Sequence, residues 1–333
     1  MAGLITPPSG SPQARISGVG AYRPRRVVPN SELVEAIDSS DQWIQERSGI
    51  KTRFRAEDGE SVIEMSEAAA LAALDMAGLE ASDIDAVIVA TVTFAYQTPA
   101  SAPALAHRMG MSNPAAFDIS AACAGYCHGI ALASDMVRGG SARHVLVVGV
   151  ERLSDFANLT DRGTAFIFGD GAGAAIVSPS ETVGIGPTVW GSEGDKWDVI
   201  RQTESWIEVY EQKLDWPHIG MQGQSVFRWA VWGMAPVAQK AMDAAGVTAD
   251  QLDAFIPHQA NVRIIDAMCK QLKMPEHVAV ARDIVDSANT SAASVPLATE
   301  RLLRDGLVPR GGLALQIGFG AGLVYAAQVV VLP

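Results

Sequence analysis

Three side chains in separate parts of the chain could form a reactive site. Cys123 stands among small residues at an expected strand-to-helix transition, where free N–H groups and the helix dipole favour a thiolate. Those small neighbours would let a substrate reach the sulfur. His258 directly follows an apolar, strand-like run, which suits acid–base work or oxyanion stabilisation. Asn289 lies in a second turn of small residues, so together they predict a Cys–His–Asn site.

Each residue also has a simpler interpretation. Cys123 could be a buried packing residue, His258 could cap the end of a strand, and Asn289 could be a helix N-cap. The catalytic interpretation is favoured because all three residues fall at related places in the predicted fold. Cys127 follows one turn after Cys123, and Cys269 falls inside a helix expected over 262–272, so both are predicted to pack.

An internal repeat indicates how these residues are positioned. Residues 73–88 recur 168 residues later as 241–256, with eight of the sixteen positions identical. Chance similarity between alanine-rich helices would explain the shared alanines, but not the shared Gly and the Asp-Ala pair before a strand. The same offset aligns Cys123 with Ser291, two positions after Asn289. We therefore expect the cysteine and the asparagine in matching turns that meet between two similar halves.

The elements around the site follow from apolar patterning. Continuous apolar runs are typical of strands covered on both faces, and alanine-rich or capped segments indicate helices. These patterns predict an α/β fold of two pseudo-symmetric halves, with Asn30 and Ser40 as candidate N-caps. Strands are expected over 85–93, 144–150 and 171–178, and helices over 30–37, 40–48, 61–78 and 122–136. The expected domains are a flexible tail at 1–14, halves at 15–185 and 186–333, and an insertion near 191–225.

Composition excludes several classes of protein. The chain is 48% hydrophobic and 19% charged, unlike a disordered chain, and its three cysteines do not suggest a disulfide framework. The formal net charge of −12 argues against nucleic acid or an anionic membrane as partner. No cysteine or histidine spacing suggests a metal site. Without a signal peptide or an unbroken apolar span, we expect a cytoplasmic protein.

The motifs resemble those of the thiolase-fold condensing enzymes, most closely the β-ketoacyl-acyl-carrier-protein (ACP) synthase III family. A thiolase would carry a second catalytic cysteine in the C-terminal glycine-rich segment, and an elongating synthase would carry a second histidine in place of Asn289. The resemblance implies a layered α-β-α-β-α architecture. The similar segments occur in family order at 40–50, 122–125, 161–173, 257–261, 289–294 and 318–322.

The resemblance implies a decarboxylative Claisen condensation that initiates fatty acid synthesis. Cys123 would take the acyl group of an acyl-CoA primer, and malonyl-ACP would then enter. His258 and Asn289 would donate hydrogen bonds to the malonyl thioester oxygen as carbon dioxide leaves. Backbone N–H groups of Cys123 and Ala321 would form the oxyanion hole, and Phe319 would flank the malonyl carboxylate. The product would be a 3-oxoacyl-ACP, and no permanently bound cofactor is expected.

Two binding surfaces are implied in the same way. A tryptophan would stack on the adenine of CoA while arginines bind its phosphates, and a basic helix face would receive the acidic carrier protein. A core tryptophan, surface arginines and a solvated helix face are the simpler interpretations. The residues concerned are Trp43, Arg47 and Arg228 for CoA, and Arg263, Lys270 and Lys273 for ACP.

Three positions depart from the family pattern. Ala288 replaces the usual glycine before Asn289, which would restrict the loop if φ is positive. Ala321 also replaces a glycine, at little cost because a backbone N–H is needed there. Thr98 stands where members restricted to acetyl primers tend to carry Phe, which predicts a roomier pocket for branched or longer primers.

The resemblance also implies a homodimer whose interface completes the primer pocket. A priming ketosynthase of a polyketide pathway and an acyl transferase of the same fold are the alternative functions. Retention of both His258 and Asn289 argues for decarboxylation and against simple acyl transfer. An inactive partner subunit would lack the nucleophile, and Cys123 is present.

Overall fold

The computed structural model describes residues 8–333, so residues 1–7 of the expected tail lie outside the described part. Strand β1 (Gln13–Tyr22) starts just before residue 15, where we expected the first half to begin. The Ser11 amide donates to the Val137 carbonyl at 3.2 Å, and the Ser11 hydroxyl donates to the Ser180 carbonyl at 3.2 Å. Backbone contacts with the first half therefore begin ahead of β1.

Two five-stranded sheets of the same topology form the frame. In each sheet two antiparallel pairings are followed by two parallel ones. This shared order confirms the duplicated α/β fold. The first sheet runs β1, β7 (Gly171–Ser180), β6 (Val145–Glu151), β4 (Ala86–Ala90) and β5 (Ala115–Ile119). The second runs β8 (Val189–Ser192), β14 (Val324–Val331), β13 (Leu313–Gly320), β11 (Ala254–Pro257) and β12 (Ala279–Val280).

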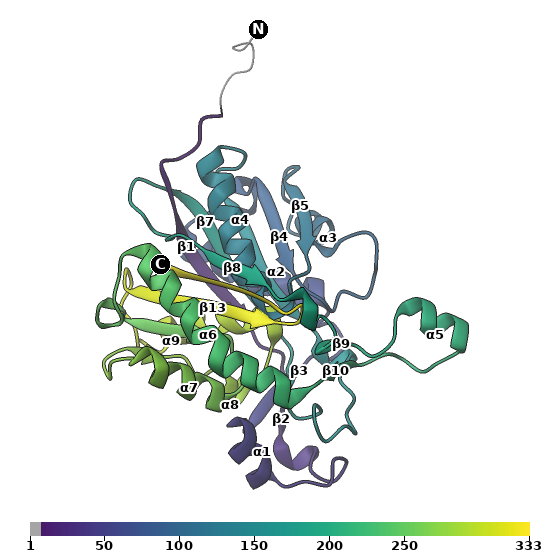
Figure 1. The fold of residues 1–333 in the computed structure, drawn as a ribbon. Coiled ribbons are helices and arrows are strands. Elements are labelled where there is room, and N and C mark those ends of the chain that lie inside the picture. Colours follow the sequence, from purple (N-terminus) through teal and green to yellow (C-terminus); the bar gives the residue numbers. More distant parts are fainter. Residues whose placement is uncertain (1–7) are drawn as a thin grey trace.

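Helices complete the expected α-β-α-β-α layers (Figure 1). Helices α4 (Gly125–Gly139) and α9 (Ser294–Arg304) share one apolar core with strands of both sheets. Helices α2 (Val62–Ala77) and α3 (Ser101–Arg108) pack on the outer face of the first sheet. Helices α6 (Gly223–Ala245) and α7 (Val262–Leu272) pack on that of the second. Within residues 8–333, no helix combines the length and the apolarity that a membrane crossing needs.

Local signals placed most element ends correctly. Ser61 and Glu64 form a capping box at the start of α2, and Gly78 ends that helix in the left-handed conformation. Ser40 caps α1 (Asp41–Ser48) as expected. The helix expected over 30–37 is wrong, because only a short 3-10 turn forms there, followed by further turns. The Asn30 side chain does not cap it but donates to Asp41 Oδ1 at 2.6 Å and to the Ile50 carbonyl at 2.8 Å.

Smaller elements connect the layers. An insertion after β8 carries β9 (Ile200–Gln202), α5 (Trp206–Gln212) and β10 (Ile219–Met221). In Figure 1, α5 stands at the end of an arm that projects from the body. Strands β2 (Arg26–Pro29) and β3 (Thr52–Arg55) form a two-stranded sheet near α1, and α8 (Ile284–Ser287) precedes Asn289. Seven 3-10 turns occur among residues 8–333, at 30–32, 81–83, 122–124, 153–155, 194–196, 249–251 and 291–293.

Cys123 lies in one of two turns that share a backbone shape, and Asn289 lies two residues before the other. Each is a 3-10 turn just before a central helix, spanning 122–124 and 291–293. Ala122 and Ser291 open these turns with left-handed φ values of 44° and 48°. Ala122 thus matches Ser291, and Cys123 matches Ala292. The expected pairing of turns is confirmed, but its register differs by one residue from the offset that the repeat predicted.

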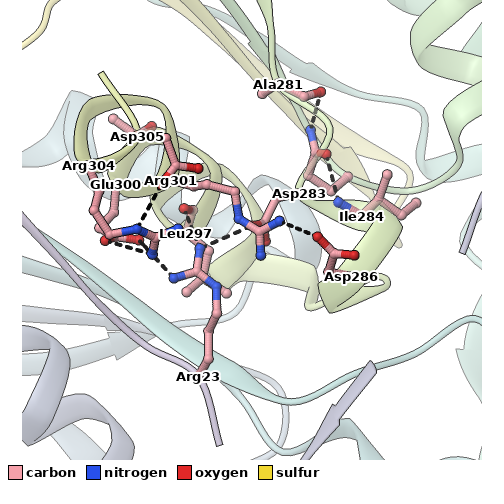
Figure 2. Close-up of polar contacts among 12 residues, drawn as sticks. Arg23, Ala281, Asp283, Ile284, Asp286, Leu297, Glu300, Arg301, Arg304 and Asp305 are labelled. Atoms are coloured by element: carbon pink, nitrogen blue, oxygen red, sulfur yellow. Dashed lines mark hydrogen bonds and ion pairs between the residues drawn. The ribbon is translucent and has the colours of Figure 1, made fainter. Parts of the chain in front are cut away.

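An ion-pair network ties the two halves together next to α8 (Figure 2). The Asp283 carboxylate lies 3.0 Å from Arg23 Nη2 and 2.6 Å from Arg301 Nε. Arg23 also contacts Glu300 at 2.8 Å, and Arg301 contacts Asp286 at 2.7 Å. The Asp283 side chain is almost fully buried and begins the segment that leads to Asn289. The ion pairs of Asp283 with Arg23 and Arg301 therefore hold in place the segment that leads to Asn289.

We expect Asp283→Asn to lower the free energy of unfolding by about 3 kcal/mol, because two largely buried cations would lose their shared counter-charge. Arg304→Ala is the matched control, since its pairs with Glu300 and Asp305 involve a half-exposed arginine, and it should cost less than about 1 kcal/mol. Urea unfolding of both variants measures the difference. Equal urea midpoints for the two variants would contradict the larger contribution to stability that we assign to the buried Asp283 ion pairs.

Candidate active site

One cavity of about 760 Å³ contains the candidate catalytic residues. It is lined from both halves of the fold, as the repeat predicted. Cys123 comes from the turn before α4, His258 from the end of β11, and Asn289 from the segment after α8. The expected supporting and CoA-binding residues that also line it are Phe319, Ala321, Trp43, Arg47 and Arg228.

The Cys123 thiol is held by its surroundings as a neutral group. Burial raises the pKa of Cys123 to about 12, although a hydrogen bond with the Ser291 side chain lowers it and the nearby Glu151 charge raises it further. Desolvation therefore opposes the thiolate character that we expected from the start of helix α4. The thiol needs a partner that removes its proton during attack.

The His258 imidazole is neutral and lines the cavity. Burial lowers the pKa of His258 to about 3. Its Nδ1 lies 2.7 Å from Ser294 Oγ, which accepts a hydrogen bond from the Gln259 amide at 3.4 Å. With the Ser294 hydroxyl as the donor to Nδ1, the ring proton sits on Nε2. A neutral Nε2–H donor fits stabilisation of a developing oxyanion.

Asn289 is oriented by contacts on both sides. Its backbone donates to the Ile167 carbonyl at 2.9 Å and accepts from the Gly169 amide at 3.0 Å, which joins it to the first half. Its side-chain Oδ1 accepts from the Ser291 amide at 2.8 Å. The remaining amide group, Nδ2, is left as a hydrogen-bond donor for a substrate in the cavity that Asn289 lines.

Ala288 holds a conformation that normally requires glycine. Its φ is 56° and its ψ is −159°, and the side chain is buried. An L-residue in this region costs of the order of 1–3 kcal/mol. The restriction that we expected for a positive φ is thus present directly beside Asn289.

We expect Ala288→Gly to raise the free energy of unfolding by about 1 kcal/mol, since relief of strain exceeds the added flexibility of the unfolded chain. Ala238→Gly within α6 is the control, and it should be destabilising by about 1 kcal/mol because that residue is helical and buried. Thermal unfolding of both variants compares them. A lower midpoint for Ala288→Gly would contradict the proposed strain.

The end of β13 packs closely on the nucleophile. A Cβ atom at Gly320 would lie 2.8 Å from both Cβ and Sγ of Cys123, so only glycine permits this approach. Ala321 follows and lines the same cavity. The Phe319 ring meets the His258 ring edge to face, with 5.3 Å between centroids. An apolar wall therefore lies beside the neutral imidazole.

The outer part of the cavity is aromatic and basic. The guanidinium groups of Arg47 and Arg162 lie 5.2 and 5.1 Å from the centroid of the Trp43 ring. A flat ligand that stacks on the Trp43 ring would displace one of these guanidinium groups. The displaced group would then lie beside the ligand. Arg263, at the start of α7, also lines the cavity and lies over the Phe227 ring.

Other expected residues lie outside the cavity. Thr98 is exposed in the loop after β4 and does not line the cavity of this single chain. Lys270 is in the last turn of α7, but Lys273 lies just beyond that helix, in a left-handed conformation. The shared helical face is therefore wrong for Lys273. Among residues 8–333, no three His, Cys, Asp or Glu side chains gather as metal ligands would.

Four contributing residues were not identified from sequence. Arg162 stacks on Trp43, and Ser294 orients His258. Ser291 and Glu151 lie next to Cys123. Ser291 and Ser294 fall inside a segment that the motifs singled out, whereas Glu151 is a charged residue at the end of an apolar strand. The only sign of Glu151 in the sequence was this acidic residue at the end of an otherwise apolar strand.

Comparisons with known proteins match this architecture. The family model for 3-oxoacyl-ACP synthase III matches residues 117–194, and the model for its C-terminal part matches residues 242–332. The chain is 60% identical to β-ketoacyl-ACP synthase III 1 of Streptomyces coelicolor, over 99% of both chains. It is 51% identical to the mycobacterial β-ketoacyl-ACP synthase III of Mycobacterium marinum, over 99% of this chain and 98% of that one.

Solved structures agree. A priming β-ketosynthase from a polyketide biosynthetic pathway superposes with a TM-score of 0.96 and 48% identity, over 99% of each chain. The 3-oxoacyl-ACP synthase III of Pseudomonas aeruginosa has a TM-score of 0.89 and 35% identity, over 96% of this chain and 98% of that one.

Proposed function

The chain belongs to the β-ketoacyl-ACP synthase III family of condensing acyltransferases, and from that premise we propose that it condenses an acyl-CoA primer with malonyl-ACP. The products are a 3-oxoacyl-ACP, carbon dioxide and CoA, and the reaction initiates fatty acid synthesis. The observation that carries the proposal is the meeting of Cys123, His258 and Asn289 in one cavity.

In the first half-reaction Cys123 attacks the primer thioester and retains the acyl group. The N–H groups of Cys123 and Ala321 stabilise the oxyanion of the tetrahedral intermediate. The close packing of Gly320 on the thiol supports this arrangement, because it keeps the β13 backbone beside the reacting carbonyl. CoA then leaves by the outer part of the cavity.

In the second half-reaction malonyl-ACP loses carbon dioxide. His258 Nε2–H and Asn289 Nδ2 donate to the malonyl thioester oxygen and stabilise the enolate, which attacks the acyl group on Cys123. The neutral His258 supports this role, because a cationic imidazolium would stabilise the carboxylate that must leave. The apolar Phe319 ring beside it favours departure as an uncharged gas.

Substrate binding follows the charge distribution. Trp43, Arg47 and Arg228 are proposed to hold the nucleotide of CoA at the outer end of the cavity. Arg263, Lys270 and Lys273 are proposed to receive the acidic carrier protein. We place the enzyme in the cytoplasm, and the proposed reaction needs no permanently bound cofactor.

We also propose a homodimer that completes the primer pocket. Strand β5 lies at the edge of its sheet and, in the described part of the chain, pairs only with β4. Phe117 on β5 and Val92 and Tyr96 in the adjacent loop are exposed. Thr98 belongs to that loop, so pairing of these edges would bring it to the partner subunit's cavity.

Analytical ultracentrifugation should find a dimer, and Phe117→Lys should weaken it.

A second function has specific support. The structural similarity to a priming β-ketosynthase of polyketide biosynthesis favours the same condensation with a different fate for its product. Small Thr98 supports branched or longer primers in either pathway.

The test is the intact mass of the protein after incubation with mixed acyl-CoAs, followed by malonyl-ACP. An acyl adduct on Cys123 that malonyl-ACP removes as 3-oxoacyl-ACP is expected, and its mass identifies the primer. If malonyl-ACP does not remove the adduct, the result would contradict condensation and favour acyl transfer to another acceptor. Absence of any adduct would contradict the proposal.

A further inference from the structure

A buried carboxyl group next to Cys123 has no role in the reaction described so far. Glu151 ends β6 and is fully buried. Its Oε2 accepts hydrogen bonds from Thr93 Oγ1 at 2.7 Å, Thr91 Oγ1 at 3.2 Å and the Val92 amide at 3.1 Å. Its Oε1 accepts only from Ser291 Oγ, at 3.1 Å, among the described residues. One carboxyl oxygen is thus saturated, while the other faces a single hydroxyl.

The Ser291 hydroxyl joins this carboxyl to the nucleophile. It lines the same cavity as Cys123, lies close enough to the thiol to lower its pKa, and donates to Glu151. The Ser291 turn reaches β6 because position 149 is glycine, where a Cβ would lie 2.2 Å from the Ala292 carbonyl oxygen. Thiol, hydroxyl and carboxyl therefore form a chain in which each group can pass a proton to the next.

Charge determines where the proton rests. Burial raises the pKa of Glu151 to about 7, although its hydrogen bonds lower it, and the Glu151 charge raises the pKa of the Cys123 thiol. Two desolvated acids this close cannot both be anions, so they share one negative charge. The resting enzyme keeps the proton on sulfur, since the thiol is the weaker acid of the pair. Transfer must therefore accompany attack by the sulfur.

We propose that Glu151 takes up the Cys123 proton through Ser291 when the sulfur attacks the primer thioester. The inference rests on the proposed function of Cys123. As the bond from sulfur to the acyl carbon forms, the thiol proton moves to Ser291 Oγ and the Ser291 proton moves to Glu151 Oε1. The bond from the acyl carbon to CoA sulfur then breaks, and CoA leaves as a thiolate.

The second half-reaction returns the proton. The enolate carbon bonds to the acyl carbon, and the bond from that carbon to Cys123 sulfur breaks. The sulfur recovers a proton from Ser291, which recovers its own from Glu151, so the enzyme ends as it began. In the acyl-enzyme between these steps Glu151 is neutral, and no anion lies behind the thioester when the malonyl carboxylate enters. Ser291 is thus a catalytic residue, and Glu151 acts through it.

Ser291→Ala tests the relay, because it removes the hydroxyl but keeps the backbone N–H that orients Asn289. Single-turnover acylation by acyl-CoA should slow about 100-fold, within the usual contribution of general acid–base catalysis. Decarboxylation of malonyl-ACP without primer should not change, because His258 and Asn289 remain. Ser287→Ala is the matched control, since this nearby buried hydroxyl bonds to no described residue, and both rates should stay normal.

Infrared difference spectra give a second measurement. Acylation of the unmodified enzyme should produce the carbonyl band of a neutral carboxylic acid, which Glu151→Gln should lack. If Glu151→Gln does not fold, Ser291→Ala and the spectrum of the unmodified enzyme decide. Normal acylation by Ser291→Ala, equal loss of acylation and decarboxylation, or no acid band in the unmodified enzyme would each overturn the relay. Failure of the unmodified enzyme to acylate would instead contradict the proposed function.

Discussion

Cys123→Ala is expected to form no acyl-enzyme with any acyl-CoA and to lower 3-oxoacyl-ACP formation by at least about 10⁴-fold. The Cys123 sulfur carries the acyl group between the two half-reactions. No other described residue that lines the cavity has a thiol that could take over this role. Intact-protein mass and product formation measure the two losses separately.

Cys127→Ala is the matched control. Cys127 is fully buried in the first turn of α4, about one turn after Cys123. Its loss should cost about 1 kcal/mol of stability through a small cavity, with normal acylation. Condensation by Cys123→Ala, or lost acylation in a folded Cys127→Ala, would reverse the assignment of the nucleophile.

Asn289→Ala is expected to separate the half-reactions. Acylation of Cys123 should proceed at its normal rate, while decarboxylation of malonyl-ACP should fall about 10²–10³-fold, the usual effect of removing one donor from an oxyanion site. The reason is the orientation of the amide, whose Oδ1 is held by the Ser291 amide and whose Nδ2 is left for the substrate. Rapid-quench measurement of each half-reaction provides the comparison.

Asn289→Asp separates loss of the donor from loss of structure. The carboxylate can still accept the Ser291 N–H, but it has no donor for the thioester oxygen. Decarboxylation should therefore be as slow as in Asn289→Ala, while the turn keeps its shape. Normal decarboxylation by Asn289→Asp would show that the Nδ2 donor is not needed.

The fold was predictable because the chain contains its unit twice. The segments at 73–88 and 241–256 each combine the end of an outer helix with the start of a buried strand, and the two sheets indeed share one strand order. The positions of Cys123 and Asn289 followed from that symmetry. The helix expected over 30–37 was wrong because Asn30 is used in long-range hydrogen bonds to Asp41 and Ile50, which local capping patterns do not contain.

The protonation states in the site could not be predicted in the same way. A cysteine before a helix suggests a thiolate, yet desolvation in the assembled site and the nearby Glu151 raise the pKa of Cys123, which keeps the proton on sulfur. The Ser291–Glu151 contact joins residues 140 positions apart. Such contacts depend on how the halves dock, and a single sequence carries no local pattern for them.

The division of the site between two halves has a consequence for biosynthesis. During translation Cys123 and Glu151 are synthesised in the first half of the chain. His258, Asn289 and Ser291 are added only in its last quarter. A nascent or truncated chain therefore holds a thiol with no group that can decarboxylate malonyl-ACP. The complete site exists only after the second half of the chain has folded onto the first.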